Sequence, residues 1–597
     1  MKPVWKWVIG ILLTLILVVI AGLWYLGNHW RPILNEKIHE IVLSSSDSLY
    51  QVSYDDLDFN MVTGNAYLYN FKLTPDTNVY NELKAQRKAP DNIYDISVAR
   101  LAIRDFHPKR IYTERKLNID EIMIENPDIK VVNQTQAYND KVQPKDQRTL
   151  YQKISKILNE LTVEHIAFEN VNIAYTNRNE KKEKTTRLKN VNIDITDLRV
   201  DSTSQEDSLR FYNARSVDFK MNDYRIATGD SLYYIDLKGI QFTSTNRTMV
   251  LSGLQMMPRY SKVDFHKKTK IAKERFELRF DTISIKHIDL FKFLKQQRLY
   301  AGEVVLGKSK VEIYQNTAYP KKKAKEKIGK FPHQELRKLA FPIKIDTLTL
   351  KEALVTYQEY NLKSGQIGTV SFHNTHGTFY NITNDSLALI HNPYMTADIH
   401  SKFMNNGKLH INFGFNMLDK LGAFTYKGSL TAMNAKALNP LTKPLAMVEV
   451  SSGYFDRLHF NVKANEYKAV GRVDFFYRNL AVQIITKESD GSKSKNGMVS
   501  ILTNKFLIND SNPDANEKFH PGPINYRRPL TASFFNFLWK SLFEGVKASV
   551  GIDKKREAKL TATAEEADKA VGKLKKFFKG IFHKKEKKEQ QDSLKRQ

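Results

Sequence analysis

A period-two alternation of apolar and polar residues runs through most of this 597-residue chain. It is plain in LNIDEIMIENPDIKVV, residues 117–132, which alternates, breaks at Asn-Pro and alternates again. Successive side chains of a β-strand point to opposite faces, so the pattern predicts strands with one apolar and one polar face. Similar phrases recur at 161–176 and 343–358, and we interpret each phrase as a β-hairpin.

Short matches at a nearly constant spacing predict a tandem duplication. Val131 in DIKVV corresponds to Ile313 in KVEIY, and Tyr175 corresponds to Tyr357, in both cases 182 residues later. Each copy also carries a polar, Lys-rich insert followed by a short helical pattern. The predicted organisation is a segment at 1–30, a β module at 31–235, its second copy at 236–405, a third β block at 406–510 and a tail at 511–597.

The N-terminal region predicts a membrane anchor. Val8 to Leu26 holds 19 residues without a charge, about 28 Å of helix, which is enough to cross a bilayer core. Tryptophans flank this run, and Lys2 and Lys6 favour a cytoplasmic N-terminus. The alternative is a cleaved signal peptide, but the run exceeds the usual apolar region and no small-residue cleavage site follows it. The bulk of the chain is then expected outside the cytoplasm.

Two further helices are predicted in the tail. Phe535, Leu538, Leu542, Val546 and Val550 follow helical spacing in the first helix. The second is basic and amphipathic, and is expected to lie on an anionic bilayer surface or to pack on the protein or a partner. Its candidate membrane-surface residues are Leu574, Lys575, Lys576, Phe577, Phe578, Ile581 and Phe582.

Composition and motifs point away from catalysis. The chain has no cysteine, which excludes disulfides and thiol chemistry, and no nucleotide-binding, hydrolase or zinc-protease motif occurs in a suitable context. The closely spaced His373 and His376 are interpreted as polar strand positions. The formal charge of +28 favours an anionic partner, but no nucleic-acid recognition module accompanies it. We therefore expect no enzyme, no cofactor and no nucleic-acid partner.

The apolar positions of the repeated phrases are bulky and form the candidate site. They could line an open groove for acyl chains, or they could form the dry core of stacked β-sandwiches, and the periodicity leaves both alternatives open. The candidate lining residues are Leu101, Ile103, Ile122, Ile124, Ile129, Val131, Ile166, Phe168, Ile173, Ile283, Ile285, Val311, Ile313, Leu348, Leu350, Val355 and Tyr357.

Three stretches carry a resemblance to a known family. The uncleaved N-terminal helix followed by VSYDDLDFNMVTGNAYLYNFKL resembles the opening of AsmA-like proteins of Gram-negative envelopes. Residues 117–132 resemble their repeated strand pair, and residues 439–484 are similar to their C-terminal segment. The resemblance implies an inner-membrane anchor and a periplasmic β-groove related to those of TamB and the bridge-like lipid transfer proteins.

The expected fold class is mainly β: an elongated, curved, mostly antiparallel β-groove of tandem meander modules, with an N-terminal transmembrane helix and C-terminal amphipathic helices. The resemblance implies that the groove holds phospholipid or another acyl-chain lipid and serves outer-membrane lipid homeostasis. It allows an outer-membrane or envelope protein partner and supplies no catalytic residues. The alternative function is a structural or assembly scaffold with closed β-sandwich domains and no lipid transfer.

Overall fold

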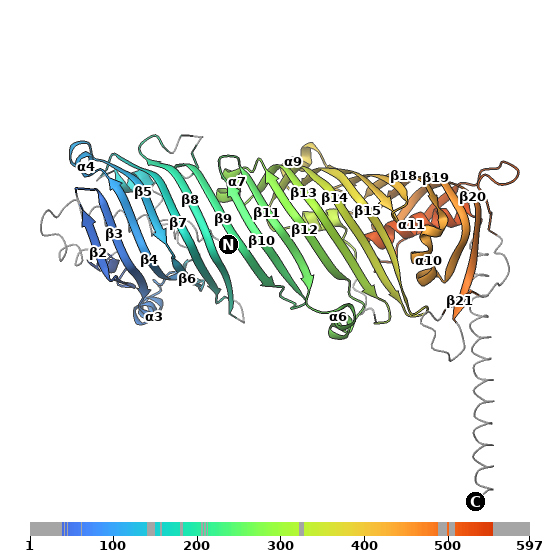
Figure 1. Cartoon of the computed structure of the whole chain (residues 1–597), viewed down its shortest axis with the longest axis horizontal. Coiled ribbons are helices and arrows are strands. Elements are labelled where there is room, and N and C mark those ends of the chain that lie inside the picture. The colour runs from blue at the N-terminus through green and yellow to red at the C-terminus, as the bar shows by residue number, and fades with distance from the viewer. Residues whose placement is uncertain are drawn as a thin grey trace, which may run out of the picture. The chain divides into compact units, whose positions relative to one another are not determined.

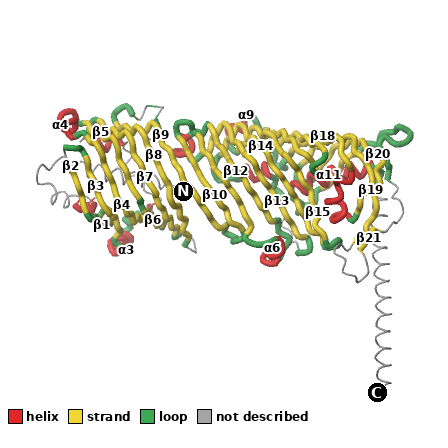
Figure 2. Tube along the Cα trace, viewed as in Figure 1, coloured by secondary structure: helices red, strands yellow, loops and turns green. Residues whose placement is uncertain are grey.

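The chain is mainly β, as the alternation predicted. The computed structural model describes residues 39–552, apart from 41, 45, 61, 140–149, 156–157, 180–182, 205–206, 208–209, 212, 321–326, 488–497 and 501–507. Most described residues lie in strands of one large, mostly antiparallel sheet, and the described helices other than α11 are short (Figures 1 and 2). The chain divides into two compact units. Unit 1 comprises the described residues up to Arg225 with Asp236–Gly253 and Ser284–Gln296, and the remaining described residues form unit 2.

Among the described residues of unit 1, most lie in strands β1 to β9, which short helices accompany. Long strands alternate in burial along their length, because every second side chain turns toward the core. The strands are β1 (Tyr50–Ser53), β2 (Asp56–Asn60), β3 (Asn65–Pro75), β4 (Asn92–Phe106), β5 (Lys116–Glu125), β6 (Asp128–Asn133), β7 (Glu160–Asn177), β8 (Lys184–Val200) and β9 (Ala214–Ala227). The helices are α3 (Thr77–Ala85), α4 (Pro108–Glu114), α5 (Leu150–Ile154) and α7 (Leu290–Gln296).

The phrase at 117–132 is not a hairpin, so that prediction is wrong. Its two halves, β5 and β6, do not pair with each other: both pair antiparallel with β4 and parallel with β7. They are consecutive stretches of one interrupted strand. Asn126 has a positive φ of 50°, and Pro127 lacks the N–H that a ladder requires, so the strand breaks locally without turning back.

The other two phrases are also single strands. Residues 161–176 lie within β7, and residues 343–358 lie within β14 (Ile343–Asn361). Register shifts interrupt β7 between Phe168 and Val171, and β14 between Leu350 and Ala353. A bulge adds one residue and restarts the alternation, which in the sequence looks like the break between two strands of a hairpin.

The 182-residue spacing has a counterpart in strand pairing. Val131 pairs with Tyr175 in the parallel ladder of β6 and β7, and 182 residues later Ile313 of β13 (Leu299–Asn316) pairs with Tyr357 in the parallel ladder of β13 and β14. A parallel pair needs a crossover connection. Each connection carries a helix, α5 in the first case and α8 (Pro332–Arg337) in the second.

Unit 2 continues from β14 as an antiparallel meander, and the predicted boundary at residue 405 falls in the turn of the β16–β17 hairpin. Strand β9 ends in unit 2, and β10 (Tyr233–Thr243), β11 (Thr248–Pro258) and β12 (Arg275–Lys286) also contain residues of both units. The remaining strands are β15 (Gln366–Thr383), β16 (Tyr394–Phe403), β17 (Gly407–Asn416), β18 (Phe424–Asn434), β19 (Val448–Ala464), β20 (Lys468–Lys487), β21 (Met498–Ser500) and β22 (Gly522–Arg527). The remaining helical elements are α6 (Lys262–Thr269), α9 (Ser386–His391), η3 (Ala435–Leu438), α10 (Asn439–Ala446) and α11 (Phe534–Ser549).

Helix α11 packs on β20 and β22 through its small residues. Phe537 is fully buried, together with Ser541 and Gly545, whereas Phe535, predicted for the apolar face, is 60% exposed. A Cβ on Gly522 of β22 would lie 2.1 Å from the Gly545 carbonyl oxygen. The backbones of α11 and β22 therefore approach more closely than large side chains between them would allow. For this reason α11 buries the face that carries Gly545.

A buried histidine joins the aromatic core of unit 2. His333 on α8 is 1% exposed, and its ring centroid lies 5.0 Å from that of Phe415 and 5.9 Å from that of Phe331. An apolar surrounding disfavours the imidazolium ion, and burial lowers the pKa of His333 to about 4. The imidazole is therefore neutral at pH 7.

This burial predicts a loss of stability in mild acid. An unfolded histidine has a pKa of about 6.5, so the unfolded state binds more protons than the folded state between pH 6.5 and 4. Unfolding free energy should fall across that window by about 3 kcal/mol more than in a His333→Phe variant. Urea unfolding of the full-length chain at pH 7 and pH 4.5 measures this difference. The exposed-histidine variant His459→Asn should behave as the wild type, and an equal pH response in His333→Phe would contradict the assignment.

Candidate functional site

Strand register in unit 1 places the predicted apolar residues in rows across one sheet face. Ile103 of β4 pairs with Ile122 of β5, which pairs with Ile166 of β7. The neighbouring row joins Leu101, Ile124 and Phe168, and β6 adds Ile129 beside Ile173. Directly paired residues of adjacent strands share a face, so the predicted residues of this unit form one continuous surface.

In unit 1 this surface is a closed core. Leu101, Ile103, Ile122, Ile124, Ile129, Val131, Ile166 and Phe168 are each at most 7% exposed, and Ile173 is half-buried. Ile111 of α4, Ile154 of α5 and Leu158 belong to the same cluster, so segments outside the sheet cover the face. These residues of unit 1 are therefore shielded from solvent.

The same rows run through unit 2. Leu306 of β13 pairs with Leu350 of β14, and Val311 pairs with Val355. The rows extend beyond the predicted residues through β15, β16 and β17. From Leu350 the partners are Gly377, Ile399 and Ile411, and from Val355 they are Phe372 and Phe403. The contribution of these strands to the face follows from their register.

Burial changes along this face of unit 2. At the C-terminal strands Tyr426, Val462 and Phe475 are at most 2% exposed, because α11 lies over them, and Tyr426 Oη is 2.6 Å from Ser541 Oγ. The predicted residues of unit 2 in β12, β13 and β14 are half-buried instead: Ile283, Val311, Ile313, Leu348, Leu350, Val355 and Tyr357. Ile285 of β12 belongs to unit 1 and is half-buried as well. The apolar side chains of the unit 2 residues retain contact with solvent, which distinguishes them from the buried equivalents in unit 1.

One short helix marks the edge of the covered region. Helix α10 contacts β14, β15 and β19, and Figure 1 shows it beside the C-terminal strands. A Cβ on Gly368 of β15 would lie 2.3 Å from Leu445 Cγ, so the helix rests directly on the strand where a side chain is missing. Gly368 has the same strand parity as Val370 and Phe372, which places α10 on the apolar face.

A polar group lies within one apolar row, because Tyr357 pairs with Ile313 of β13 and with Val370 of β15. The Tyr357 hydroxyl donates to Glu359 Oε2 at 2.9 Å and lies 3.3 Å from Gln315 Oε1. Burial and the neighbouring carboxylate raise the pKa of Tyr357, so the hydroxyl stays protonated. The Tyr357 hydroxyl can therefore take part in hydrogen bonding, whereas its row partners Ile313 and Val370 offer only apolar contact.

Exposed apolar residues gather along one edge of unit 2. The edge is formed where β15 leads into β16 through α9 and where β17 turns into β18. The α8–β14 connection reaches the same edge, since Ile343 begins the strand that pairs with β15 at Thr383. The exposed residues are Leu339, Phe341, Leu387, Ile390, Tyr394, Leu418 and Leu421.

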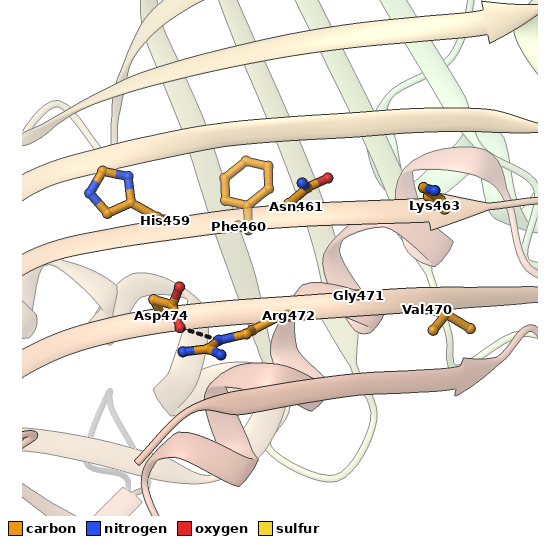
Figure 3. Close-up of a pocket in the computed structure, with 8 residues that line it drawn as sticks. All are labelled: His459, Phe460, Asn461, Lys463, Val470, Gly471, Arg472 and Asp474. Atoms are coloured by element: carbon orange, nitrogen blue, oxygen red, sulfur yellow. Dashed lines mark hydrogen bonds and ion pairs between the residues drawn. The ribbon is translucent and has the colours of Figure 1, made fainter. Parts of the chain in front are cut away.

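The opposite face of these strands is polar. Figure 3 shows a surface depression there, over β19 and β20. Arg472 Nε of β20 donates a hydrogen bond to Asp474 Oδ1 at 2.5 Å, and His459 and Asn461 lie on the neighbouring strand β19. Arg472 and Asp474 are partly exposed and neutralise each other. No nucleophile is paired with a base among the residues that line this depression.

Two predicted features lie outside the described residues. These are the anchor at Val8 to Leu26 and the basic helix from Leu574 to Phe582. Among the helices of the described residues, none combines the length and the apolar character that a bilayer crossing requires.

Comparison with known proteins does not place the chain. No protein-family model matches it, and no curated protein matches it significantly.

The difference in cover predicts unequal stability effects at two equivalent faces. Ile124→Ala should lower the unfolding free energy by about 2–5 kcal/mol, because Ile124 is fully buried and leaves a cavity. Leu350→Ala should lower the unfolding free energy by about 1 kcal/mol, since Leu350 is only partly buried. Urea unfolding of the full-length chain, with hydrogen exchange read separately at β5 and β14, measures both. Equal losses would contradict the difference in burial.

Proposed function

We propose that this chain is an inner-membrane-anchored periplasmic protein that binds or conducts phospholipid on an apolar sheet face, contributing to envelope and outer-membrane lipid homeostasis. One observation carries the proposal: half-buried apolar residues continue in register from β13 to β17. An apolar surface that stays partly accessible to solvent suits an apolar occupant.

The dimensions of the face suit an acyl chain. Neighbouring strands lie about 4.8 Å apart, so each row offers an apolar contact about every 4.8 Å across the strands. Each methylene removed from water contributes about 0.8 kcal/mol, so contact with a few rows can hold a lipid tail without a specific pocket. Bulky aliphatic and aromatic residues without nearby charge, such as Val311, Val355 and Phe372, suit this role.

Charge and the exposed edge account for the other parts of a phospholipid. The net charge of +28 favours anionic headgroups and membrane surfaces. Leu387 and Ile390 of α9 expose apolar side chains at the edge of unit 2, where a tail could enter while its headgroup stays in water. The resemblance of the sequence to AsmA-like proteins and the predicted anchor support the periplasmic location and the envelope role.

A scaffold function is the second candidate, and unit 1 favours it. Ile122, Ile124 and Val131 are fully buried, as they would be in a closed structural core. In that case the protein would assist assembly of envelope partners without moving lipid. The two functions make opposite predictions for substitutions on the uncovered part of the face.

Lipid carried by the purified full-length chain tests the proposal. Mass spectrometry of organic extracts should detect bound phospholipid in the wild type. Leu350→Arg should reduce this lipid several-fold while far-UV circular dichroism stays unchanged, because the new charge interrupts a half-exposed row. The matched control is Thr349→Arg, which places the same charge on the other face of the same strand and should leave bound lipid unchanged.

Two outcomes would overturn the lipid proposal. One is a wild-type chain that carries no phospholipid and takes up no fluorescent phospholipid from vesicles. The other is equal lipid loading in Leu350→Arg and the wild type. Either result would favour the scaffold function.

A further inference from the structure

Three histidines lie side by side on the polar face of β15, β16 and β17. His376 pairs with His400, and His400 pairs with His410, so each strand contributes one imidazole to a single row. The ring centroids of His400 and His410 are 4.2 Å apart and nearly parallel, and those of His376 and His400 are 5.5 Å apart. This row is unrelated to the apolar face, because its side chains point the opposite way.

A carboxylate completes the cluster. Asp398 Oδ1 lies 3.1 Å from His400 Nε2 and 2.9 Å from His410 Nε2. One ligand atom from each of these three residues lies within 4.8 Å of the other two. Asn412 Nδ2 is 3.3 Å from His410 Nε2. Two imidazole nitrogens and one carboxylate oxygen therefore converge on a point at the protein surface.

We propose that Asp398, His400 and His410 form a binding site for a first-row transition-metal cation such as Zn²⁺. Zinc–ligand bonds measure about 2.0–2.2 Å for imidazole nitrogen and carboxylate oxygen. The present spacing reaches such bonds by rotation of the two rings, which their partial exposure leaves room for. Water is available for the remaining positions, and Asn412 can hydrogen-bond a metal-bound water.

The donor set selects the class of cation. Imidazole nitrogen with one carboxylate suits Zn²⁺, Cu²⁺ and Ni²⁺, whereas Ca²⁺ and Mg²⁺ prefer oxygen ligands alone. Soft cations that need thiolates are disfavoured, because the chain has no cysteine. Zn²⁺ is the appropriate probe because it has no redox chemistry.

A bound cation would join two strands. Asp398 and His400 belong to β16 and His410 belongs to β17, so the metal would bridge the hairpin across its polar face. A ligand that binds only the folded state stabilises it in proportion to occupancy. Metal binding would therefore stabilise β16 and β17. These strands also carry Ile399 and Ile411 on the opposite face, but the stabilisation does not depend on whether those residues hold lipid.

Zinc titration of the full-length chain tests the site. Isothermal calorimetry with Zn²⁺ should give one more equivalent for the wild type than for a His400→Asn/His410→Asn double variant. Loss of outer-shell partners alone weakens metal sites by about 10–100-fold, so loss of two ligands should weaken this site by about 100-fold or more. The matched control is His459→Asn. His459 of β19 is an exposed histidine on the same polar face as the cluster, and it pairs with Asp474 rather than with another histidine.

A second readout separates a metal site from a hydrogen-bonded cluster. Zn²⁺ should slow hydrogen exchange in β16 and β17 of the wild type and of His459→Asn, but not of the double variant, and a chelator should reverse the effect. Equal zinc stoichiometry in the wild type and the double variant would overturn the proposal. So would an equal loss of binding in His459→Asn, because binding would then be non-specific to surface histidines.

Discussion

The structure depends on keeping the alternation of apolar and polar side chains in phase from strand to strand. A shift of one residue in any ladder would move a whole strand's apolar set to the polar face. In unit 1 the row of Ile103, Ile122 and Ile166 crosses two interfaces of opposite direction, one antiparallel and one parallel, and stays on the same face. Bulges after Phe168 and Leu350 restore this phase where the strand would otherwise drift out of it. The bulges are therefore part of what makes one continuous apolar surface possible.

The sequence predicted the local pattern well, since strand alternation depends only on neighbouring residues. The mainly β fold and the apolar residues at 122, 124, 166, 348 and 350 follow from it. The hairpin interpretation failed because a bulge and a turn produce the same interruption in the alternation. Only hydrogen-bond partners distinguish them, and the partners of β5 are β4 and β7, which lie far apart in sequence.

Features that depend on the register between strands could not be predicted. His373 and His376 were noticed because they are close in sequence, whereas His400 and His410 were not, although their rings are 4.2 Å apart. The cover of each face was also beyond prediction. Helix α11 buries Phe537 and Ser541 rather than Phe535, because the close approach of Gly522 to Gly545 decides which side of the helix fits.

The same strand pairing occurs in both units, but the apolar face differs in how far other segments bury it. This difference in burial, rather than the sheet itself, determines what the apolar face can do. Phe168 and Leu350 are 182 residues apart and occupy the same place in their parallel ladders, opposite Ile124 and Leu306. Phe168 is 7% exposed within a cluster that includes α4 and α5 residues, whereas Leu350 is half-buried. Equivalent strands and equivalent pairing thus give a sealed core in one case and a solvent-accessible apolar surface in the other. The hydrophobic effect scales with the apolar area removed from water. An apolar molecule that covers the partly exposed face of unit 2 would therefore bind with a favourable free energy. Any lipid-binding capacity is therefore expected to reside in β13 to β17, with the covered face of unit 1 providing stability.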